Sequence, residues 1–101
     1  MSEARACEHL FTVKRELGLH ARPAGRFVGL AARFPCEIQV AREGSDEWVS
    51  GRSVLSLLSL GATRGTRLRV RATGAEAEEA VAALGALIEE PEEPALEGSR
   101  R

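Results

Sequence analysis

Apolar and polar positions alternate along four stretches of the chain, as they do in strands with one buried face. In residues 36–42 the alternation is regular, and in residues 66–72 arginines alternate with small or apolar side chains, so one face of that strand meets water. A turn-forming cluster at 43–46 precedes a short apolar stretch, which predicts a hairpin. The predicted strands cover residues 9–15, 36–42, 47–50 and 66–72.

Apolar residues recur at helical spacing in three other stretches. The first contains Pro23 in its first turn, where the missing N–H costs nothing, and Pro35 ends it. The second follows Ser53, a natural N-cap, and stops at Gly61. The third has an acidic first turn, which suits the positive start of a helix. The predicted helices cover residues 22–34, 54–60 and 75–88.

The order of these elements is strand, helix, strand, strand, helix, strand, helix (βαββαβα). Short strands joined by hairpins favour an antiparallel sheet, and the fold class that follows is α+β: a two-layer, open-faced sandwich of four strands with three helices on one face. We expect a flexible leader over residues 1–8, one folded domain over 9–88 and a disordered acidic tail over 89–101. Leu57, Leu60 and Cys36 are expected in the core, and Cys7 at a frayed terminus.

Length and composition narrow the class of protein. A chain of 101 residues has room for one compact domain. No apolar run approaches the ~20 residues that span a bilayer, and the first residues do not resemble a signal peptide, so we expect a cytoplasmic protein without membrane insertion. A net charge of −1 argues against a nucleic-acid binder. The two cysteines show no metal-ligand spacing, and we expect both to be reduced, with neither metal nor cofactor.

The segment 18–24 (Gly-Leu-His-Ala-Arg-Pro-Ala) carries the chemistry. His20 stands just before the helix marked by Pro23, where backbone N–H groups and the helix dipole favour an anion. Neutral imidazole is nucleophilic near pH 7, and Arg22 can donate charge-assisted hydrogen bonds to phosphate oxygens. A helix cap or an ordinary surface histidine is the alternative. The combination of glycine, histidine, arginine and proline favours a phosphoryl acceptor.

This segment resembles the active-site motif of HPr, the histidine-containing phosphocarrier of the bacterial sugar phosphotransferase system. Residues 51–61 resemble the regulatory-serine helix of the same family, and the likeness extends over roughly residues 9–88. The resemblance implies that His20 takes a phosphoryl group, derived from phosphoenolpyruvate, from enzyme I and passes it to enzyme IIA-type acceptor proteins. Arg22 would stabilise the phosphoryl group. The chain would then be a carrier that is not a turnover catalyst on its own.

The second motif implies regulation and docking. Ser53 matches the serine that HPr kinase/phosphorylase modifies in many bacteria, although an N-cap role accounts for it completely. Val54, Leu55 and Leu58 match a hydrophobic docking patch, and Arg26 would border it and steer an acidic partner. The arginine cluster of Arg22, Arg26 and Arg33 is either this basic patch or an ordinary solvated face.

Two functions remain open. The first is a monomeric phosphocarrier for sugar uptake. The second is a regulatory binding module, working through Ser53 and partner docking in a nitrogen-related or other phosphotransferase branch with little sugar flux. A hydrolase that uses His20 is disfavoured, because no second acid, base or nucleophile motif lies near it in the sequence.

Overall fold

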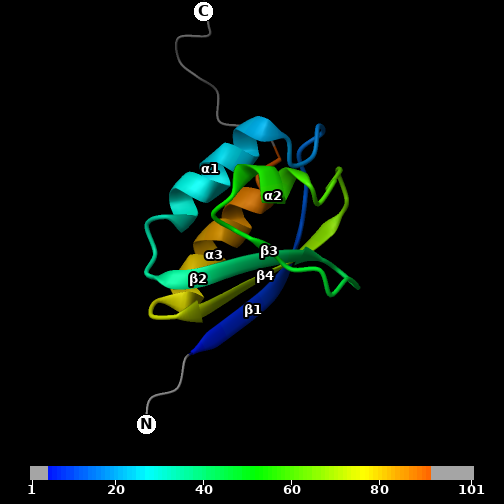
Figure 1. Ribbon diagram of the computed structural model, residues 1–101. Coiled ribbons are helices and arrows are strands. Elements are labelled where there is room, and N and C mark those ends of the chain that lie inside the picture. Colours follow the sequence, from blue (N-terminus) through cyan, green and yellow to red (C-terminus); the bar gives the residue numbers. More distant parts are fainter. Residues whose placement is uncertain (1–4, 92–101) are drawn as a thin grey trace, which may run out of the picture.

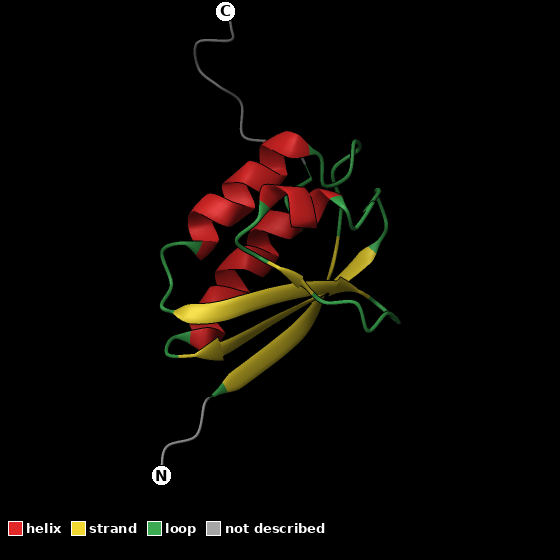
Figure 2. Cartoon of the chain, in the orientation of Figure 1, coloured by secondary structure: helices red, strands yellow, loops and turns green. Residues whose placement is uncertain are grey.

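The computed structural model describes residues 5–91 and contains seven elements in the predicted order (Figure 1). Figure 2 shows the two layers, with the three helices on one face of the sheet. The elements are β1 (Ala6–Thr12), α1 (Ala21–Ala31), β2 (Cys36–Arg42), β3 (Val49–Ser50), α2 (Val54–Leu58), β4 (Arg67–Gly74) and α3 (Ala77–Ile88).

The sheet is antiparallel throughout, with the strand order β1-β4-β2-β3. The predicted hairpin is confirmed by the pairing of β2 with β3, in which Gln39 lies opposite Ser50 and Val40 opposite Val49. The last strand in the sequence, β4, lies between β1 and β2, with Val70 opposite both His9 and Val40. The α+β open-faced sandwich predicted from the alternation is therefore the observed fold.

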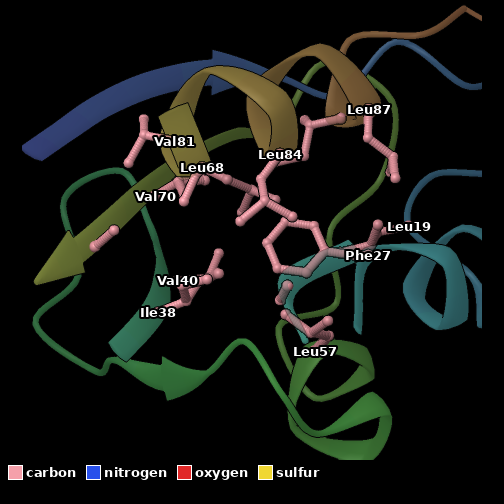
Figure 3. Close-up of a cluster of buried hydrophobic side chains, with 14 of the residues drawn as sticks. Leu19, Phe27, Ile38, Val40, Leu57, Leu68, Val70, Val81, Leu84 and Leu87 are labelled. Carbon is pink, nitrogen blue, oxygen red and sulfur yellow. The ribbon is translucent and has the colours of Figure 1, made fainter. Parts of the chain in front are cut away.

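The core lies between the sheet and the helices, where the apolar halves of both layers meet. Every second residue of β4 points into it, and α1 contributes Phe27, whose ring projects between Leu84 of α3 and Leu57 of α2 (Figure 3). Leu57 and Leu60 are buried as predicted, and so is Cys36. Burial of a side chain of this kind stabilises the fold by about 1.5–3 kcal/mol.

The face of the sheet away from the helices carries the arginines of β4 and is partly covered by one aromatic side chain. Arg69 and Arg71 lie over the ring of Trp48, with guanidinium carbons 4.6 and 3.9 Å from its centroid. Arg69 also donates to Glu8 at 2.9 Å, and Arg71 to Gln39 at 3.0 Å. Cation–π contacts and local hydrogen bonds therefore organise this face.

The boundaries of the first elements differ from the prediction. The first strand runs from Ala6 to Thr12 instead of 9–15, because β4 pairs with it from Thr73 back to Arg67. The predicted leader is therefore wrong for residues 6–8, and Cys7 is a half-buried strand residue instead of part of a frayed end. The helix α1 ends at Ala31 instead of residue 34, and the chain leaves it through a tighter turn.

The later boundaries differ for similar local reasons. The helix α2 ends at Leu58, after which the amides bond to carbonyls three residues back. The strand β4 starts one residue later than predicted and continues to Gly74. The helix α3 begins at Ala77 because Glu76 has a left-handed backbone, with φ of 62°. The last ten residues of the predicted tail lie outside the described residues.

Candidate functional site

A loop between β1 and α1 brings His20 to the surface. It is fixed at its start by two backbone hydrogen bonds, from Val13 N to the Thr66 oxygen at 2.9 Å and from Gly65 N to the Val13 oxygen at 2.8 Å. It is fixed at its end by the buried Leu19, whose amide donates to the Ala62 oxygen at 3.0 Å. The position of His20 is thus set by contacts with the segment that joins α2 to β4.

Gly18 makes this loop possible. Its φ is +75°, in the left-handed region that glycine enters without cost. A Cβ at this position would overlap the carbonyl oxygen of Ala62 and lie 2.9 Å from the Cα of Thr63. The close approach of two backbone segments therefore requires a residue without a side chain.

His20 is the N-cap of α1. Its backbone is extended, with φ of −87° and ψ of −170°, and its carbonyl oxygen accepts the first helical hydrogen bond from Ala24 N at 3.0 Å. Its side chain makes no capping hydrogen bond and is partly exposed. The backbone N–H groups of Ala21 and Arg22 precede the first helical hydrogen bond, which Ala24 N donates, and Pro23 has no N–H of its own. The first turn contains no acidic residue, so no carboxylate of that turn offsets the positive end of the helix dipole.

Arg22 lies in the same turn, exposed to water, two residues after the histidine. A guanidinium there can reach an anion held at the helix start, and its donors match the oxygens of a phosphoryl group. The sequence placed His20 and Arg22 together at the start of this helix, and the structure has them in that arrangement.

Arg26, one turn further along α1, is engaged with a residue assigned by the sequence to the tail. Its Nη1 donates to Oε1 of Glu90 at 2.9 Å, and its Nη2 to Oε2 at 3.3 Å. Oε1 also accepts from Nη2 of Arg15 at 2.9 Å. The hydrogen bond from Arg26 holds the pKa of Glu90 below its usual value; burial opposes this, and the charges of Arg26 and Arg15 add to it. The positive charge of Arg26 is therefore partly offset by this carboxylate, which Arg26 shares with Arg15.

Sequence reasoning missed both ends of this contact. The sequence predicts Arg15 at the end of the first strand, whereas in the structure Arg15 follows that strand, its side chain is buried and its Nη1 donates to the Leu87 oxygen at 2.9 Å. The sequence also predicts Glu89 and Glu90 in the disordered acidic tail. Glu89 Oε2 instead accepts from Thr12 N at 2.9 Å, at the end of β1. One available signal was that both glutamates directly follow the apolar period of the last helix.

The second predicted region, around α2, is partly confirmed in its local structure. Oγ of Ser53 accepts from Ser56 N at 3.1 Å, so Ser53 is the N-cap. Leu55 is 79% exposed, while Val54 and Leu58 are partly buried against the core. The chain that follows the C-terminal end of α2 leads to the Ala62 carbonyl that binds Leu19 N, whereas Ser53 stands at the N-terminal end of α2.

Two further properties concern the described part of the chain only. Across residues 5–91 no helix has the length and apolar character needed to cross a membrane. Within the same residues, no three histidine, cysteine, aspartate or glutamate side chains gather in a way that could hold a metal ion.

The described chain is an open-faced sandwich with a partly exposed histidine at the start of a helix, and comparison with known proteins defines its class. A family model described as "PTS HPr component phosphorylation site" matches residues 7–90. The chain therefore belongs to the HPr family, the phosphocarriers of the phosphotransferase system.

Individual relatives agree with this assignment. The chain is 42% identical to the phosphocarrier protein HPr of Pseudomonas aeruginosa over 77 residues, which is 76% of this chain and 84% of that protein. It is 39% identical to the multiphosphoryl transfer protein of Haemophilus influenzae over 85% of this chain but only 17% of that much longer protein. The crystal structure of HPr from Bacillus anthracis superimposes with a TM-score of 0.77 at 32% identity, covering 83% of this chain and 98% of that one.

Proposed function

We propose that this protein takes a phosphoryl group on His20 from enzyme I and passes it to enzyme IIA-type proteins in the course of sugar uptake. The observation that carries the proposal is the imidazole at the start of α1, partly exposed and making no capping hydrogen bond. Family membership supports it independently. The carrier works in the cytoplasm as a monomer and needs no metal or cofactor.

The transfer needs little from the protein beyond position and charge. A nitrogen of the neutral imidazole forms an N–P bond with its lone pair, while the bond between phosphorus and the donor breaks and the donor keeps its electron pair. The phosphoryl oxygens then lie near the first amides of α1 and the guanidinium of Arg22, which favour the added negative charge. The N–P bond keeps a high transfer potential. A nucleophile of the acceptor protein can therefore bond to the phosphorus while the N–P bond breaks and the imidazole nitrogen keeps the electron pair.

Partner docking is assigned to the exposed side of α2. Leu55 projects 79% exposed, with Val54 and Leu58 beside it, and an apolar side chain this exposed gains free energy when a partner covers it. Arg26 contributes less to this surface than the sequence suggests, because Glu90 holds its guanidinium.

Ser53 is a second phosphorylation site in this proposal, modified by HPr kinase/phosphorylase. A phosphate on a helix N-cap still offers oxygens to the Ser56 amide and is favoured by the helix dipole. It also adds about −1.5 to −2 charges at the end of α2. Repulsion would then weaken docking of an acidic enzyme I surface.

The test is phosphorylation of the purified full chain by enzyme I and phosphoenolpyruvate. We expect an acid-labile, base-stable label that the variant His20→Ala loses. The control is His9→Ala, which removes the other histidine, an exposed residue of β1 whose ring meets Phe11 edge to face. A label that survives in His20→Ala, or a wild-type protein that takes none, would refute the proposal.

The regulatory alternative makes the opposite prediction in the cell. If Ser53→Ala removes all phosphorylation in vivo and His20→Ala removes none, the protein is a regulatory module of a nitrogen-related or other branch with little sugar flux.

A further inference from the structure

A single carboxylate joins the two segments on either side of His20. Glu90 accepts from Arg15, five residues before the histidine, and from Arg26, six residues after it. Figure 1 shows why this is possible, since the end of α3 lies beside the start of α1. We call Arg15, Arg26 and Glu90 the Glu90 clamp.

The arginine before the histidine is the deeper half of the clamp. Arg15 is 3% exposed, and a buried guanidinium requires an opposite charge and hydrogen-bond acceptors nearby. Glu90 supplies the charge and the Leu87 carbonyl a second acceptor. The backbone oxygen of Arg15 accepts from Gly18 N at 3.0 Å, so the anchored arginine also fixes the turn that leads to His20.

The arginine after the histidine completes the clamp with a two-pronged contact. The guanidinium of Arg26 meets both oxygens of Glu90, at 2.9 and 3.3 Å, and such paired contacts fix direction as well as distance. Because Arg26 belongs to the second turn of α1, the axis of this helix is tied to the same carboxylate as the loop. His20 lies between these two anchored residues, at the N-cap of α1.

We propose that Glu90 is a positioning residue for phosphoryl transfer: by binding Arg15 and Arg26 together, it holds His20 in line with the first amides of α1. The inference rests on the proposed function of His20. Glu90 does not touch the phosphoryl group. Its effect comes through geometry, because transfer reactions are sensitive to orientation, and a misplacement of about 1 Å costs on the order of 10²-fold in rate.

The first experiment compares full-length wild type with Glu90→Gln, using enzyme I and phosphoenolpyruvate at 25 °C. We expect kcat for phosphorylation of the carrier to fall about tenfold, less than the ~10²-fold of a full ångström, because glutamine keeps part of the hydrogen bonding. The positioning effect is measured in kcat and not in KM, because the substitution also releases Arg26 from Glu90 beside the docking surface and can change KM by itself. The matched control is Glu89→Gln, which removes the neighbouring carboxylate bonded to Thr12 and leaves the clamp intact.

A second variant separates positioning from a purely structural role. Arg26→Gln breaks the clamp from the other side at a residue about one-third exposed, so the fold survives even if Glu90→Gln unfolds. The double variant should lose no more rate than Glu90→Gln alone, because loss of the Glu90 carboxylate already removes its contact with Arg26. A purely structural clamp would lower the Tm of each variant and leave kcat at 25 °C unchanged.

The outcomes distinguish the two proposals. Phosphorylation of wild type on His20 together with normal kcat in folded Glu90→Gln, or in Arg26→Gln where the first variant unfolds, overturns the role of Glu90 and leaves the phosphocarrier intact. Rate losses that simply add in the double variant also overturn it. A wild-type chain that takes no label on His20 removes the proposed function and this inference with it.

Discussion

Substitution of Gly18 by alanine should destabilise the fold more than its small size suggests. The residue has a φ of +75°, and a left-handed backbone costs a residue with a Cβ about 1–2 kcal/mol. The added Cβ would also overlap the Ala62 oxygen and lie 2.9 Å from the Cα of Thr63. Both obstacles are backbone atoms, so they cannot rotate aside as a flexible side chain would.

The magnitude follows from these two contributions. Overpacking of a tight site costs about 1–3 kcal/mol, so the sum is at least about 2 kcal/mol. In a domain of 60–100 residues, each kcal/mol lowers the Tm by about 4–8 °C, which gives a decrease of roughly 8–16 °C. The overlap also displaces the carbonyl that binds Leu19 N, so phosphoryl acceptance by His20 should slow even below the melting temperature.

Thermal and urea unfolding followed by circular dichroism measure the effect. The control is Gly25→Ala in α1, where a Cβ would meet nothing within 4 Å and the chain is exposed. Alanine there should stabilise the helix by about 0.5–1 kcal/mol. The reasoning is refuted if Gly18→Ala melts within about 2 °C of wild type, since the predicted decrease is several times larger.

Three further predictions use single residues. Ser53→Ala should lower the free energy of unfolding by about 1 kcal/mol in urea, through loss of the bond to Ser56 N, and an unchanged value would contradict the cap. Folding lowers the pKa of Glu90, chiefly through the Arg26 hydrogen bond, so the ionised carboxylate stabilises the fold at pH values above the ordinary carboxyl pKa of 4.5. The stability advantage of wild type over Glu90→Gln should therefore shrink as the pH falls below about 4.5. A constant advantage down to about pH 3 in urea unfolding would contradict this reasoning. Burial raises the pKa of both thiols, and the charge of Glu78 adds to the effect at Cys7. Because Cys7 is half-buried and Cys36 is buried, a thiol reagent at about pH 8 should modify Cys7 first and Cys36 slowly. The reverse order in a mass spectrum of partly labelled protein would contradict this difference in accessibility.

Local patterns were enough to predict the existence and order of all seven elements. The strand over residues 36–42 was placed to the residue, because regular alternation and flanking Pro35 define it within a few positions. The cap at Ser53 was equally local, since donor and acceptor are three residues apart. Errors gathered at element ends, as for Glu76, whose left-handed backbone delays α3 and has no signature in the sequence.

The sequence by itself determined the sandwich architecture and, through Pro23 after it, the place of His20 at the start of a helix. Only the tertiary structure decided that Gly18 must pass close to Ala62, and that Glu90 binds Arg15 and Arg26, which lie 75 and 64 residues away. The physical reason is range. Periodicity and capping act between residues three or four apart, whereas a charged side chain chooses its partner only after packing of α3 against α1 has brought distant segments together.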